Sequence, residues 1–145
     1  MQNDDDSLIS IQRTKLDIHE IFVPPEQLPG GFDYPRSFHD YVLINGAKLT
    51  GLPPWGFALD VARRSAEYSA EFKRPLVLFA QAYHEDMVAG FEGLSGSDPR
   101  VIVLNPWGEP KPYVIAELDD FDAWLEWARQ ESIELGYIKP DDAEP

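Results

Sequence analysis

The chain has 145 residues, 43% of them hydrophobic, which is enough apolar material for a single domain spanning residues 1–145. It contains no cysteine, which excludes disulfides and thiolate chemistry. Its formal net charge of −14 repels phosphate groups, so we expect no direct binding to nucleic acid or to a membrane surface.

The negative charge is concentrated in the second half of the chain. Residues 1–74 carry 11 acidic and 8 basic side chains, a net of −3, whereas residues 75–145 carry 15 and 4, a net of −11. Such a surface attracts a basic protein and accelerates the encounter with it. It also favours solubility, which is the simpler interpretation of the charge taken alone.

Both ends of the chain lack apolar periodicity. Residues 1–7 and 139–145 are polar, and we expect them to be mobile. The start, MQNDDD, carries acids where a secretory signal has positive charge, and no apolar run approaches the ~20 residues that cross a bilayer. We therefore predict a cytoplasmic protein.

The first half of the chain is predicted to be irregular and then helical. Residues 8–18 fit either a strand or a short helix, and residues 22–34 are too rich in proline and glycine to be regular. A helix is predicted over 35–45, with proline in its first turn and Asn-Gly as its stop. A longer helix is predicted over 56–73, ending before Pro75.

After Pro75 the apolar pattern changes to that of strands. Apolar and alternating runs separated by short turn-rich connections predict four strands, near residues 76–83, 86–92, 100–105 and 113–118. Successive strands with short connections indicate an antiparallel meander.

The last predicted element is a helix over 119–134. Asp119 is expected to cap its N-terminus, and Phe121, Trp124 and Ala128 form part of one apolar stripe that predicts the buried face. Together the elements predict an α+β fold, a central and mostly antiparallel sheet with packed helices.

Two tryptophans occupy similar turns. Trp55 and Trp107 both lie in Pro-Trp-Gly sequences, and turn residues are usually at the surface. An exposed tryptophan is a frequent interface anchor. The alternative is that each ring folds back over the edge of the core, since tryptophan has a large apolar area to bury.

The sequence offers no arrangement typical of an enzyme or of a metal site. His19, His39 and His84 are scattered, without the i, i+4 spacing of a helical zinc site. The loop 93–99 contains neither a nucleophile elbow nor the lysine of a phosphate-binding loop. We expect no catalysis, no cofactor and no bound metal.

Three features occur together between residues 33 and 130. A short helix after Pro35 ends in Asn45-Gly46, an acidic residue begins a strand over 86–90, and the last strand is followed by the helical sequence DDFDAWL. This arrangement resembles the SUKH superfamily, which includes a yeast cell-wall synthesis regulator and many bacterial immunity proteins that neutralise polymorphic toxins.

The resemblance implies a non-enzymatic immunity protein that binds a cognate toxin and occludes its active site. The negative charge suits a toxin with a basic surface, such as a nuclease. The alternative is a regulatory or scaffold domain of the same fold that binds an endogenous protein partner.

The candidate partner-binding residues lie in, or flank, the predicted connections between strands. Alternate connections of a meander share one end of the sheet, and loops carry binding more often than packed strands do. The patch that we expect first is Glu85, Asp86, Trp107 and Glu109. The second choice, at the opposite end of the sheet, is Glu92 and Asp98.

If the acidic second half steers a basic partner, added salt will slow association markedly. Exposed charges are screened beyond a Debye length of ~8 Å at physiological ionic strength, so the association rate constant falls while dissociation changes less. Stopped-flow or surface-based kinetics across a salt series measure this. An association rate that does not respond to salt would contradict the electrostatic part of the interpretation.

Overall fold

The computed structural model describes residues 18–46, 49, 52–82, 87–93, 98–107 and 113–138. Its elements in chain order are α2 (Ile18–Ile21), η1 (Pro25–Gln27), α3 (Arg36–Asn45), β1 (Trp55–Phe57), α4 (Val61–Phe72), β2 (Leu76–Ala82), β3 (Met87–Glu92), β4 (Val101–Asn105), β5 (Tyr113–Leu118) and α5 (Phe121–Glu134). The ends predicted to be mobile and residues 8–17 lie outside these ranges. Within these ranges no helix is long and apolar enough to cross a membrane.

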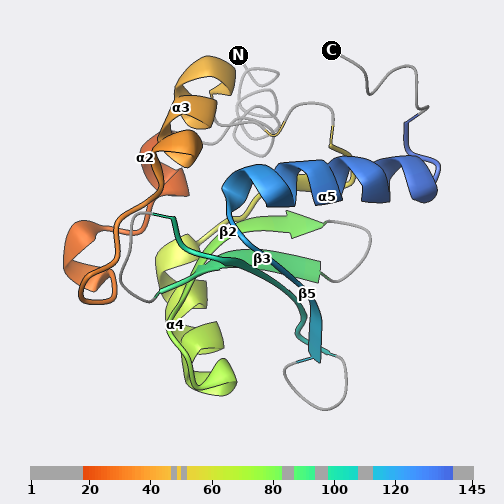
Figure 1. Cartoon of the computed structure of the whole chain (residues 1–145). Helices are drawn as coiled ribbons and strands as arrows, with labels where there is room; N and C mark the ends of the chain where they lie inside the picture. Colours follow the sequence, from red (N-terminus) through yellow and green to blue (C-terminus); the bar gives the residue numbers. More distant parts are fainter. Residues whose placement is uncertain are drawn as a thin grey trace, which may run out of the picture.

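The strands form one five-stranded antiparallel sheet in the order β1-β2-β3-β4-β5 (Figure 1). Each strand pairs with the one next to it in the chain, as in the predicted meander. The four predicted strands are confirmed to within one residue at each end. The α+β fold class is therefore confirmed, with a fifth strand added at the β2 side of the sheet.

Helices cover both faces of the sheet. Figure 1 shows α5 and α3 above the strands and α4 below them. As a result every residue of β3, and every residue of β2 except Gln81, is buried. Because both faces of the sheet are covered, the sequence of β3 is apolar almost throughout and does not alternate between apolar and polar residues.

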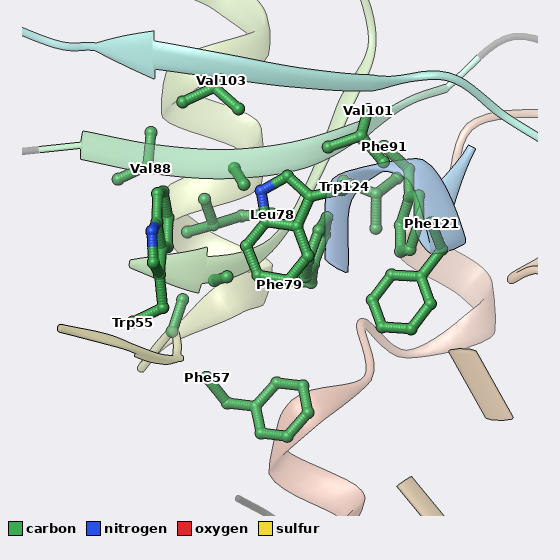
Figure 2. Close-up of a cluster of buried hydrophobic side chains, with 14 of the residues drawn as sticks. Trp55, Phe57, Leu78, Phe79, Val88, Phe91, Val101, Val103, Phe121 and Trp124 are labelled. Carbon is green, nitrogen blue, oxygen red and sulfur yellow. The ribbon is translucent and has the colours of Figure 1, made fainter. Parts of the chain in front are cut away.

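An aromatic cluster joins the sheet to the helices above it (Figure 2). Phe79 of β2 stacks on Phe91 of β3 with 4.5 Å between ring centroids, and Trp124 of α5 meets Phe79 edge-on at 4.9 Å. Phe38 of α3 contacts Phe121 of α5 at 5.2 Å. All five rings are fully buried, so the predicted stripe on the last helix is its core face. Offset and edge-on pairs of this kind stabilise beyond their buried area.

Helix α4 also closes part of one sheet edge. The Ser65 hydroxyl accepts a hydrogen bond from the Leu78 backbone N–H at 2.8 Å, and the Ser69 hydroxyl does the same for Leu76 at 2.8 Å. Strand β1 pairs only with Ala80–Ala82 of β2, so these serines satisfy backbone groups that β1 does not reach.

A tyrosine fixes the irregular segment before α3. The Tyr34 hydroxyl accepts a hydrogen bond from the backbone N–H of Val23 at 2.8 Å. Burial raises the pKa of Tyr34 far above its usual range, so the phenol stays neutral and can hold this contact at any physiological pH.

Two sequence-based boundaries are wrong. The helix predicted over 56–73 begins only at Val61, because residues 55–57 are strand β1. The cap of the last helix is Asp120, not Asp119: the Asp120 carboxylate accepts a hydrogen bond from the Ala123 N–H at 2.8 Å. The predicted helix over 35–45 is confirmed as Arg36–Asn45.

Replacing Gly90 by alanine will destabilise the sheet. A Cβ at this position would lie 2.9 Å from Leu76 Cγ and 3.0 Å from the Val77 carbonyl oxygen, and backbone of a central strand cannot move aside. We expect a loss of about 1–3 kcal/mol in the free energy of unfolding, measured by chemical denaturation. The control is Gly30→Ala, where nothing lies within 4 Å of the new Cβ and stability will be unchanged. Equal stability of the two variants would contradict the close approach of β2 and β3.

Candidate protein-binding site

Trp107 lies just beyond the end of β4, with 69% of its surface exposed. Its backbone N–H donates to the Asn105 side-chain oxygen at 2.9 Å, which fixes the turn after the strand. An indole held at the surface by a fixed backbone needs little ordering when a partner covers it. Trp107 is therefore the described residue that best fits an interface anchor.

The other Pro-Trp-Gly tryptophan has the opposite environment. Trp55 is only 4% exposed and meets Trp124 edge-on at 5.3 Å. It belongs to β1 and pairs with Ala82, and its ring packs against Trp124 and Trp127 of α5 (Figure 2). Of the two alternatives, folding back applies to Trp55 and surface exposure applies to Trp107.

A hollow of about 210 Å³ adjoins Trp107. The residues lining it come from α4, from the ends of β2 and β3, and from the turn after β4: Arg64, Tyr68, Gln81, Ala82, Met87, Val88, Pro106 and Trp107. The Arg64 guanidinium is fixed by the Gln81 side-chain oxygen at 2.7 Å and by the Tyr68 hydroxyl at 3.3 Å. The hollow is large enough for one side chain of a partner beside the Trp107 ring.

Sequence reasoning missed Arg64 and Tyr68 as members of this site. Both are on α4, and only the packing of α4 on the sheet places them next to Trp107, forty residues or so further along the chain. The i, i+4 spacing of the two residues indicates that they share one face of a helix. It does not indicate which part of the protein that face contacts.

Exposed apolar residues continue from this corner along β5. Tyr113 pairs with Asn105, two residues before Trp107, and is followed by Val114 and Ile115. Their exposed fractions are 46%, 36% and 38%. Trp107 thus stands at one end of an exposed apolar strand.

The remaining members of the first predicted patch, Glu85, Asp86 and Glu109, lie outside the described residues. The strand ends on either side of these residues are described, and they lie at one end of the sheet. Ala82 pairs with Met87, and Asn105 pairs with Tyr113, in a meander whose alternate connections share one end. The first patch therefore stays a prediction, and Trp107 is its one member among the described residues.

Of the second-choice residues, Glu92 is not available at the surface. It is only 7% exposed, and its carboxylate lies 2.6 Å from the Arg74 guanidinium, which itself packs over the Phe72 ring. The side chain therefore joins β3 to the end of α4 instead of facing a partner. The sequence analysis placed Glu92 at the end of a strand beside an exposed loop, but did not anticipate that this strand end is buried.

Asp98 is exposed and lies at an acidic hollow of about 580 Å³. The lining residues are Tyr34, Arg36, Ser37, His39, Asp40, Asp98, Asp120 and Asp122. Asp40 forms a long ion pair with Arg36 at 3.9 Å, and Asp120 caps α5. No set of metal-ligating side chains occurs in the part of the chain that the structure describes. The hollow adds negative potential at the sheet end opposite Trp107.

No known protein family, curated protein or solved structure matches the chain.

Removing the two Pro-Trp-Gly side chains will have opposite effects on stability. Trp107→Ala will leave the free energy of unfolding within about 0.5 kcal/mol of the parent, because the ring is mostly solvated. Trp55→Ala will cost about 3–5 kcal/mol, because it leaves a cavity beside Trp124. Thermal or chemical denaturation of both variants measures the difference. A large loss of unfolding free energy in Trp107→Ala would mean that this ring stabilises the fold, which would contradict its assignment as an interface anchor.

Proposed function

We propose that this chain is a binding protein that neutralises a toxin by covering it, as the SUKH immunity proteins that it resembles do, without catalysis of its own. The observation that carries the proposal is Trp107, an anchor-type residue held at the surface beside a hollow. Interface hot spots are enriched in tryptophan and lie next to pockets that exclude water. Tyr113 and Ile115 add exposed apolar area on the neighbouring strand β5.

Charge supports a basic partner. The second half of the chain carries a net charge of −11, and this half supplies both Trp107 and three of the aspartates of the acidic hollow, Asp98, Asp120 and Asp122. A nuclease toxin binds nucleic acid through a positive surface, so an acidic protein competes for that surface directly. The proposal places the chain in the cytoplasm, where such a toxin would act on nucleic acid.

Co-expression tests the proposal. The chain is produced together with the C-terminal domain of a large protein encoded next to it, and growth is scored with and without the chain. We expect the parent chain to restore growth and the double variant Trp107→Ala with Asp86→Lys to lose protection. Truncating an interface anchor costs about 2 kcal/mol or more of binding, about thirtyfold in Kd.

The control is Leu43→Ala, an exposed apolar position on α3 that lies on a different element from the proposed site. This variant will protect as well as the parent. If the double variant stays folded by circular dichroism and still protects, Trp107 and Asp86 are not the interface. If the parent chain does not protect but binds an endogenous protein, the chain is a regulatory or scaffold domain instead.

A further inference from the structure

The two edges of the sheet differ in how their backbone groups are satisfied. On the β1 side, the serines of α4 satisfy the part of β2 that β1 leaves uncovered. On the other side β5 pairs only with β4, and no strand or helix among the described residues bonds to its outer backbone. Proteins commonly protect edge strands. The β1 side ends in a strand of three residues and is partly covered by α4, whereas the whole length of β5 forms the other edge, and this difference calls for an explanation.

The open edge has little of the usual side-chain protection, since Glu117 is its one charged residue. Tyr113–Leu118 contains no proline and no lysine, and its first three residues are apolar and exposed. Strand β5 does carry a bulge, because Val103 pairs with Ala116 and Leu104 with Val114, which leaves Ile115 as the extra residue. A bulge is one device that discourages edge pairing.

The same sheet shows that such a bulge is compatible with a neighbour on the other side. Strand β2 has its own bulge against β3, with Phe79 as the extra residue. Strand β1 nonetheless pairs with β2 immediately after it, and the Ala58 N–H donates to the Phe79 carbonyl at 3.0 Å. A bulged strand here accepts a further strand, so β5 can do so as well.

Charge identifies the kind of strand that would fit. The segment from Tyr113 to Asp122 contains four acidic residues and no basic one. Among the residues that the structure describes, one of the four, Glu117, is matched by a cation, the Arg100 guanidinium at 2.8 Å, and no ion pair is seen for the other three. A second copy of the chain would bring another −14 charges to this edge, whereas a basic segment would relieve the repulsion.

We propose that β5 accepts an extended, basic segment of a partner protein as a sixth strand, with apolar residues beside Val114 and Ile115 and basic residues toward Asp119. Main-chain hydrogen bonds provide affinity in this mode of recognition, and side chains provide the choice of partner. Trp107 lies past the end of β4, at the same end of the sheet as Tyr113. This inference rests on the proposed function in one respect, the basic character of the partner.

A pair of synthetic peptides tests the pairing directly. The first is a short peptide of alternating valine and lysine, and the second has the same side chains and charge but a methyl group on every backbone nitrogen. Titration into the isotope-labelled chain, followed by NMR, gives Kd and the amide groups that shift. We expect the first peptide to shift the amides of 113–118 and the second to bind at least about tenfold more weakly, a loss of about 1.4 kcal/mol.

Variants of the chain supply a second measurement. Ile115→Lys places a cation on the exposed edge and will weaken binding of the first peptide about tenfold. Leu43→Lys introduces the same charge on exposed α3 and will leave binding unchanged. Both positions are exposed, so both variants keep the fold.

Several results would overturn the inference. They are equal affinity of the two peptides, binding of neither, an equal effect of the two lysine variants, or a dimer in sedimentation that Ile115→Lys dissociates, which would make a second copy the occupant. The inference and the proposed function can fail separately. If the chain protects growth but backbone methylation of the peptide has no effect on binding, only the strand-pairing inference is contradicted. If the peptide pairs with β5 but the chain does not protect growth, only the proposed toxin-neutralising function is contradicted.

Discussion

The stacked contact between Phe79 and Phe91 is the interaction on which the rest of the structure depends. It joins the two central strands, and the rings of Phe38, Phe121 and Trp124 pack around it from α3 and α5. Phe79 is also the extra residue of the β2 bulge. The sheet, both upper helices and the orientation of Trp55 therefore share one buried aromatic centre, and the surface features lie around it.

Much of this architecture could be predicted from local pattern, because long periodic segments report which face they bury. The strands after Pro75 and the stripe on α5 are of this kind. Strand β1 could not be predicted, because three residues are too few to show the alternation of a strand. The helical pattern of the following residues also extends back over them. Asp119 and Asp120 are adjacent and chemically equal as caps, so only the backbone could decide between them.

The candidate site was less accessible to sequence reasoning. Trp55 and Trp107 have the same neighbours in sequence, and their different exposure comes from tertiary context: Trp55 has Ala82 as its strand partner and α5 above it, whereas Trp107 lies past the end of its strand. Glu92 flanks a predicted loop and was expected to be exposed, but its ion pair with Arg74 holds it against the segment that follows α4. Arg64 joins the site only through packing of a helix distant in the sequence.

The strand order also has a consequence for how quickly the protein forms. Every strand pairs with its neighbour in the chain, so no pairing in the sheet awaits a distant segment, and β2 to β5 are joined by short connections. Folding rates rise as contacts become more local in sequence. A meander of this kind can complete its hairpins soon after each is synthesised, and the final step is the docking of α5 onto a sheet that already exists. In the protective role proposed above, such an order would let newly made chains become competent with little delay after translation ends.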